Sequence, residues 1–188
     1  MNRLFRNKRA LGTPVANLLI LTSAIILTLT VTFFATNVTT SQVQKENLYI
    51  ARSHMWYVNR TDSVGAVLII NTGPTDIVLN KITVKGLECD WNGTDSYIVY
   101  CKTDEVPQGD LPFISNFTSA ENSTVTIGRE EYTFAVAGDD FTLKSGWVMM
   151  FYMAIPERLM VYDLGLPVRM SISTTQAVYC TETLVQTA

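Results

Sequence analysis

Few side chains in this 188-residue sequence have the chemistry that catalysis or metal binding requires. His54 is the only histidine, so neither a histidine metal cluster nor a carboxylate–histidine–nucleophile triad can be built. Asp139 and Asp140 could bind Ca²⁺ together with another loop acid such as Asp104, but their spacing differs from that of an EF-hand loop. The sequence has no glycine-rich phosphate loop, Cys-X-X-Cys pair or GxSxG elbow. We therefore expect a protein that is not an enzyme and has no metal or cofactor.

The three cysteines allow at most one disulfide bond within the chain. Cys89 and Cys101 end two strand-like runs on either side of the polar turn DWNGTDS, so a bridge that ties this hairpin is the leading pairing. Cys180 is then either a buried thiol or a substitute partner for one of the other two. The spacing leaves both possibilities open.

Sites for N-glycosylation are more frequent than chance predicts. Five Asn-X-Ser/Thr sequons occur, against about two expected from the composition. The candidate asparagines are Asn37, Asn59, Asn92, Asn116 and Asn122. A threonine-rich composition inflates such counts, so the alternative of random sequons stays open.

A long uncharged stretch near the N-terminus precedes the part of the chain that contains most of these residues. The basic head MNRLFRNKRA is followed by Leu11–Gln44, which contains no charged residue. Its apolar part, Val15–Ala35, has 21 residues, about 31 Å as a helix, which matches a bilayer core of about 30 Å. The sequence therefore predicts a helix that enters a membrane.

Charge is distributed unevenly along the chain. The head holds four of the 14 basic residues and no acidic one, so the remainder carries 10 basic against 17 acidic residues, a net charge of −7. An acidic body argues against nucleic acid as a partner. The positive-inside rule keeps the basic head in the cytoplasm and places the body outside.

Beyond the uncharged stretch the sequence predicts short β-strands separated by turn residues, with no helical apolar stripe. The expected strands are 48–58, 64–70, 76–84, 96–101, 124–127, 132–136, 147–155, 159–162 and 168–184. The fold class is thus α+β, one long hydrophobic helix followed by an all-β, immunoglobulin-like β-sandwich. Residues 147–155 are apolar without alternation, which indicates a central core strand or, alternatively, a strand with one face packed on a neighbouring subunit.

The junction between the head and the apolar run distinguishes an export signal from a plain anchor. A secretory signal has an apolar core of about 7 to 15 residues and a small-residue cleavage site after it. Here the run is longer, and Phe33 stands where a small residue is needed. The basic pair Lys8-Arg9 and the small residue Ala10 lie before the run instead.

This arrangement resembles the archaeal type IV pilin and archaellin superfamily over roughly the first 40 residues. The resemblance implies that a prepilin peptidase cuts after Ala10, at a site formed by Lys8, Arg9, Ala10 and Leu11, so that the mature chain begins at Leu11. Val15 stands at the fifth mature position, where bacterial type IV pilins have glutamate, which points to the archaeal branch. Archaellins often begin with several glycines, whereas Gly12 stands alone here, which favours an adhesive pilus and leaves an archaellin possible.

The resemblance also implies how the chain works. Residues 1–10 form the leader, 11–45 an assembly helix and 46–188 an extracellular β-sandwich domain. Pro14 would lie at the start of the helix, where it costs little. The expected filament-core residues are Pro14, Leu18, Leu19, Ile20, Ile25, Ile26, Leu29, Phe33 and Phe34.

The partners implied are copies of the chain in a helical filament, the prepilin peptidase and its membrane assembly platform, and cell or abiotic surfaces. The precursor would lie in the cell membrane with a cytoplasmic N-terminus, and the mature protein in an extracellular filament. The competing hypothesis is a monomeric, membrane-anchored β-sandwich that binds a partner and needs no processing.

Overall fold

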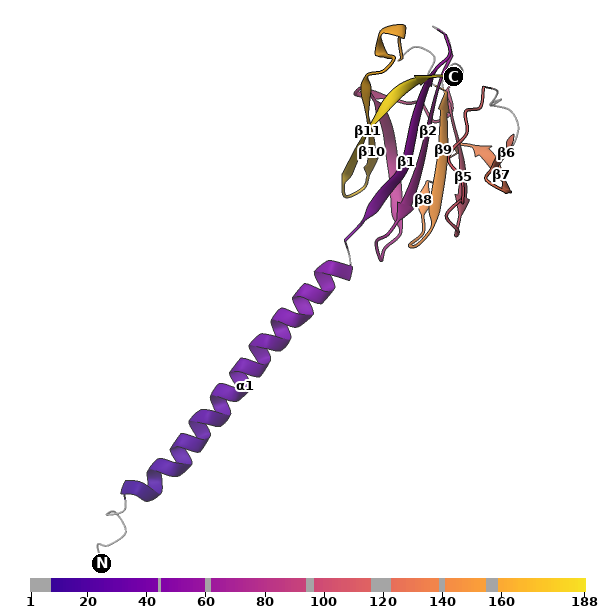
Figure 1. Ribbon diagram of the computed structural model, residues 1–188. Coiled ribbons are helices and arrows are strands. Elements are labelled where there is room, and N and C mark those ends of the chain that lie inside the picture. The colour runs from indigo at the N-terminus through magenta and orange to yellow at the C-terminus, as the bar shows by residue number, and fades with distance from the viewer. Residues whose placement is uncertain are drawn as a thin grey trace, which may run out of the picture. The chain divides into compact units, whose positions relative to one another are not determined.

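The computed structural model describes residues 8–43, 45–59, 62–93, 97–115, 123–138, 141–154 and 159–188, with the side chains of residues 8–11 and 42–43 left out. It divides into two compact units, Met1–Gln44 and Lys45–Ala188. The first contains one long apolar helix and the second an all-β body (Figure 1). The predicted fold class is therefore confirmed.

Helix α1 spans Lys8–Val43. It begins three residues before the predicted assembly helix 11–45 and ends two residues before its predicted end. Because it begins before Leu11, Pro14 lies inside the helix and not at its start, where the sequence placed it. The polar stretch from Asn37 onward stays helical to Val43, and its side chains bond to helix carbonyls.

The described residues of the body form eleven strands and one short 3₁₀ helix. The strands are β1 Leu48–Tyr57, β2 Ser63–Asn71, β3 Ile77–Val84, β4 Leu87–Glu88, β5 Ile98–Thr103, β6 Ser123–Ile127, β7 Glu130–Val136, β8 Thr142–Leu143, β9 Val148–Ala154, β10 Pro167–Thr174 and β11 Val178–Thr187, and the 3₁₀ helix η1 is Val161–Asp163.

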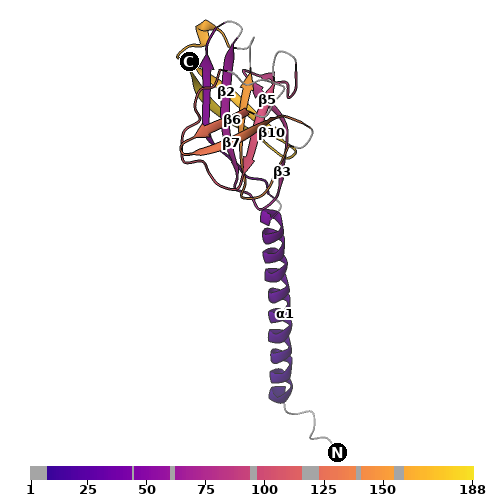
Figure 2. The ribbon, with the colours of Figure 1, turned by 90° about the vertical axis from the view of Figure 1, so that its right-hand side faces the viewer.

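One hydrogen-bonded path joins the strands in the order β4-β3-β10-β11-β1-β2-β9-β5-β7-β6, with β8 paired to β3. The path folds into layers. One apolar cluster separates β3, β10 and the β11 end from β1, β2 and β9, and a second cluster lies between that central layer and the β6–β7 hairpin. Figure 2 shows the hairpin lying across the central strands. At Met55–Tyr57 strand β1 pairs in parallel with the end of β11, which connects the outer layer to the central one.

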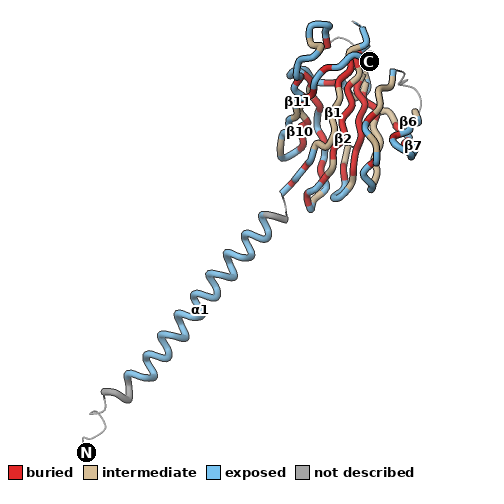
Figure 3. The backbone as a smooth tube through the Cα atoms, in the orientation of Figure 1, coloured by how far each residue is buried: buried red, intermediate tan, exposed pale blue. Residues whose placement is uncertain are grey.

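The central position of β9 explains why apolar and polar residues do not alternate in its sequence. It pairs with β2 on one side and β5 on the other. Met149, Phe151 and Met153 belong to the first apolar cluster, and Met150 and Tyr152 belong to the second. Figure 3 shows this central region as the buried part of the body. The core-strand prediction is confirmed, and the chain itself covers the face that the alternative assigned to a neighbouring subunit.

Two strand predictions need correction, and two short strands were not predicted. The run 168–184 is a hairpin, β10 and β11, and not one strand, because the chain turns at Thr174–Ala177 through hydrogen bonds to the Thr174 hydroxyl. The expected strand 159–162 contains buried Leu159 and the start of η1 instead. The short strands β4 and β8 carried no predictive pattern.

The chain enters the body at a firmly bound point, Glu46–Asn47. Glu46 is buried, and its carboxylate accepts hydrogen bonds from the hydroxyls of Thr174 at 2.6 Å and Thr175 at 3.0 Å. The Asn47 carbonyl accepts from the amides of Thr72 and Gly73. A Cβ at Gly73 would lie 2.7 Å from the Asn47 nitrogen, so only glycine allows this approach. The β10–β11 hairpin turn and the turn after β2 thus hold the first residues of the body.

Replacing Thr174 with valine should lower the free energy of unfolding by about 1–3 kcal/mol, because the buried Glu46 carboxylate loses its shortest hydrogen bond. Urea unfolding of the full chain in detergent micelles, followed by tryptophan fluorescence, measures this. Trp56, Trp91 and Trp147 all lie in the body, so the signal reports that unit alone.

Thr175→Val is the matched control. Thr175 is exposed and its bond to Glu46 competes with water, so a smaller loss is expected. Equal stability of Thr174→Val and the wild type would contradict the anchoring role of Glu46.

Candidate functional site

Helix α1 exposes an apolar surface over most of its length. From Gly12 to Ser41 it is long and apolar enough to cross a membrane, and none of its most apolar window is buried by the rest of the chain. Of the predicted filament-core residues, the large apolar ones are 50–68% exposed. These are Leu18, Leu19, Ile20, Ile25, Ile26, Leu29, Phe33 and Phe34. An N-terminal helix of this kind anchors in a membrane or acts as a signal sequence.

Most of the described polar side chains of α1 are hydrogen-bonded to the helix backbone. Hydroxyls donate to carbonyls three or four residues earlier, for example Thr28 to Ala24 and Thr32 to Thr28, both at 2.8 Å. The same bonding is made by Thr22, Ser23, Thr30, Thr36, Thr39, Thr40 and Ser41. Asn37 donates its side-chain amide to the Phe33 carbonyl at 2.9 Å. These groups can therefore leave water with little desolvation cost.

The predicted processing site lies at the first turns of α1. The backbone of Lys8, Arg9, Ala10 and Leu11 is helical, while the side chains of these four residues and all of residues 1–7 lie outside the described part. The cleavage itself stays a prediction. Pro14 stands three residues further on, and a proline inside a helix costs about 3 kcal/mol relative to alanine.

The predicted sequons lie in different surroundings. Asn59 and Asn92 are exposed on the body, and Asn59 forms a turn through its hydrogen bonds with Asp62. Asn37 lies within α1, and Asn116 and Asn122 lie outside the described residues. Asn59 and Asn92 are therefore the candidates whose exposure on the body suits a glycan.

The predicted bridge between Cys89 and Cys101 is not formed. Cys89 is buried in the first apolar cluster, whereas Cys101 packs against the second, on the other side of the central layer. Strands β4 and β5 do not form the expected hairpin, because β4 pairs with β3 and β5 with β9 and β7. Burial raises the pKa of the Cys101 thiol.

Cys180 is exposed on β11 and not buried. Its sulfur lies 3.4 Å from Ser171 Oγ and 3.2 Å from Arg169 Nη2. These hydrogen bonds, with that of Ser171 the larger, lower the pKa of the Cys180 thiol.

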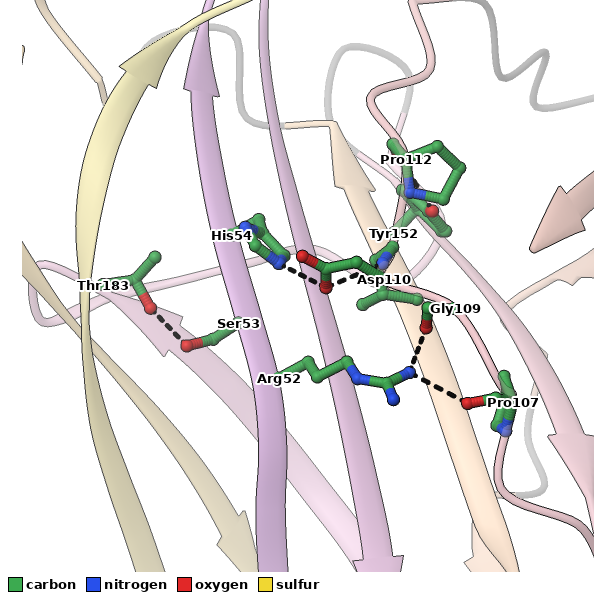
Figure 4. A network of polar contacts seen from close by, with 10 residues as sticks. Arg52, Ser53, His54, Pro107, Gly109, Asp110, Pro112, Tyr152 and Thr183 are labelled. Carbon is green, nitrogen blue, oxygen red and sulfur yellow. Dashed lines mark hydrogen bonds and ion pairs between the residues drawn. The ribbon is translucent and has the colours of Figure 1, made fainter. Parts of the chain in front are cut away.

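A polar network of the body fastens a loop that the sequence analysis did not single out. The side chains of Arg52 and His54 reach from β1 toward residues 104–115, here called the covering segment (Figure 4). The Arg52 guanidinium donates to the carbonyls of Pro107, at 3.1 Å, and Gly109. His54 Nε2 lies 2.8 Å from Asp110 Oδ1, and its ring stacks on Trp56.

Apolar contacts complete the attachment of the covering segment. Leu111 is buried in the second cluster, and the ring of Phe113 packs edge-on against Trp56. The Tyr152 hydroxyl donates to the Pro112 carbonyl at 3.0 Å, and burial raises the pKa of Tyr152. The segment and the β6–β7 hairpin together close the outer side of the central layer.

His54 has a positioning role in this network. Its ring is held between Trp56 and Asp110, so it orients the loop. Among the described residues, no group of three His, Cys, Asp or Glu side chains could hold a metal ion. Asp139 and Asp140 lie outside the described part of the chain.

No protein-family model matches the chain, and no curated protein matches it. The apolar helix followed by a β-sheet body is compatible with a pilin-like architecture.

Asp110 should make the attachment of the covering segment sensitive to acid. Partial desolvation raises the pKa of Asp110. The hydrogen bond and charge of His54, the hydrogen bond from the Leu111 amide and the charge of Arg52 lower it by more, so the net shift of the pKa is downward. Stability from such a shift is present above the unfolded pKa of about 3.9 and is lost as pH falls through the lower folded value.

Asp110→Asn should therefore reduce the free energy of unfolding at pH 7. Near pH 2 the variant and the wild type should have the same free energy of unfolding. The reduction should stay below about 1 kcal/mol because Asp110 is mostly exposed. Urea unfolding at both pH values measures it, with exposed Asp104→Asn as the charge-matched control. A deficit of equal size at both pH values would exclude the ion-pair explanation.

Proposed function

We propose that this protein is a structural subunit of an extracellular filament of the archaeal type IV pilus kind, with α1 as its assembly element. The observation that carries the proposal is the exposure of α1: its part from Gly12 to Ser41 is uncharged and apolar, has none of its most apolar window buried, and begins just after Lys8-Arg9-Ala10 at the start of the helix. In the precursor, lipid covers this surface. After the basic leader is removed, copies of the same helix replace the lipid and form the filament core.

The length and polarity of α1 favour assembly over a plain anchor. A spanning helix needs about 20 residues, whereas Gly12–Ser41 provides 30 without a charge. Its last part carries Thr36, Thr39 and Thr40, whose hydroxyls bond to the helix backbone. A stalk in water would gain solubility from charged residues, which are missing here. Such a stretch suits a helix packed against other helices.

The physical basis of assembly is a repeated, head-to-tail contact. Identical contacts that do not close into a ring generate an open helical filament. The leader prevents this in the precursor, since its four positive charges hold the N-terminus at the cytoplasmic surface. Removal of the leader makes Leu11 the first residue and leaves the helix free to leave the bilayer.

The body supplies the outer surface of the proposed filament. Both faces of its central layer are covered within the chain. The sequons on the body would carry sugars toward the medium, and attachment to cell or abiotic surfaces is the favoured role. An archaellum subunit for motility uses the same assembly and differs in its motor, which this chain does not encode.

The test is the N-terminus and state of the exported protein. Edman sequencing or intact mass should give a chain that begins at Leu11 and is recovered in filaments seen by electron microscopy. Arg9→Gln should block cleavage and filament formation, whereas Arg3→Gln, which removes the same charge away from the junction, should leave both unchanged. A mature chain that still begins at Met1 and stays monomeric in the membrane would support the anchored binding module instead.

A further inference from the structure

The residues that weaken α1 are concentrated at one place. Gly12 and Pro14 lie within four residues of the Ala10–Leu11 bond, and Val15–Val43 contains neither glycine nor proline. A Cβ added at Gly12 would meet no atom within 4 Å, so no close contact within this chain requires glycine there. Glycine and proline both disfavour a helix interior. The helix is therefore intrinsically weakest beside the predicted processing site.

Pro14 acts on one particular carbonyl. In an α-helix the N–H of each residue donates to the carbonyl four residues earlier, so the donor for Ala10 would come from residue 14. Proline has no N–H, and its ring crowds that same carbonyl. It also disfavours the helical conformation of Thr13 before it. Since α1 begins at Lys8, the carbonyl concerned is that of the Ala10–Leu11 peptide bond.

We propose that Pro14 is a positioning residue for processing: it keeps the Ala10 carbonyl free of its helical partner so that the peptidase can engage it. This inference rests on the proposed function. In the reaction, water adds to the Ala10 carbonyl carbon and the C–N bond breaks. Ala10 leaves with the leader as a carboxylate, and the Leu11 nitrogen takes up a proton to become an ammonium group. Hydrogen-bond donors that stabilise the developing oxyanion must reach the Ala10 carbonyl oxygen. In a regular helix the backbone N–H of residue 14 would already be bonded to that oxygen.

The same proline is harmless once the leader is gone. The first four N–H groups of any helix have no intrahelical acceptor. In a chain that begins at Leu11, residue 14 is the fourth, and its acceptor carbonyl has departed with Ala10. Proline is well tolerated in such a first turn. Pro14 thus weakens the precursor helix at the cut and leaves the mature helix intact.

Cleavage kinetics of the full-length precursor test this role. The precursor, carrying a C-terminal tag, is incubated with membranes that contain the prepilin peptidase, and loss of the leader is followed by mass. Pro14→Ala should slow cleavage at least tenfold, because alanine restores the donor to the Ala10 carbonyl. Asn17→Ala, which leaves every backbone donor of α1 in place, is the matched control and should stay within twofold of the wild type.

Pro14→Gly separates helix weakening from recognition of the proline ring. Glycine lacks the ring but still disfavours the helix, so its rate should fall between those of the wild type and Pro14→Ala. A Pro14→Ala precursor cut at the wild-type rate, or a Pro14→Gly precursor as slow as Pro14→Ala, would overturn the inference alone. A wild-type precursor left intact by membranes that cut another prepilin would overturn the proposed function as well.

Discussion

The need of α1 for apolar surroundings is the constraint on which the rest of this molecule depends. Thirty consecutive residues carry no charge and bury none of their most apolar window within the chain. Exposure of such a surface to water costs roughly 25 cal/mol for each Å², so apolar surroundings stabilise the helix. Most of its described polar side chains are hydrogen-bonded to its own backbone, as with Thr28 and Thr32. The helix can therefore exchange one apolar environment for another at little cost.

The body differs from α1, because its central apolar residues are buried by other parts of the same chain. Strand β9 is buried on both faces by β3, β10 and the β6–β7 hairpin of the same chain. The side chains of Arg52 and His54 form hydrogen bonds with the covering segment, which closes the outer side of the central layer. Helix α1 exposes the longest run of large apolar side chains among the described residues. This division fits a subunit whose core contacts are made by helices and whose body can face the medium.

Sequence patterns predicted what depends on local periodicity. The apolar run gave α1, and the uninterrupted hydrophobic residues 147–155 gave the central strand β9. The hairpin of β10 and β11 was missed because its turn uses the Thr174 hydroxyl in place of glycine or proline. The prediction of a Cys89–Cys101 bridge was wrong because closeness in sequence does not reveal which side of a layer a residue faces. Arg52 bonds to a loop 55 residues away, which no local pattern signals.

The first residues of the body are held by two turns that lie far apart in sequence. The Glu46 carboxylate accepts hydrogen bonds from Thr174 and Thr175 in the β10–β11 turn, and the Asn47 carbonyl accepts from the amides of the turn after β2. Because Glu46 is buried, loss of either hydroxyl would leave part of its charge without a hydrogen-bond donor. The start of the body is thus fixed by contacts inside the body, independently of α1.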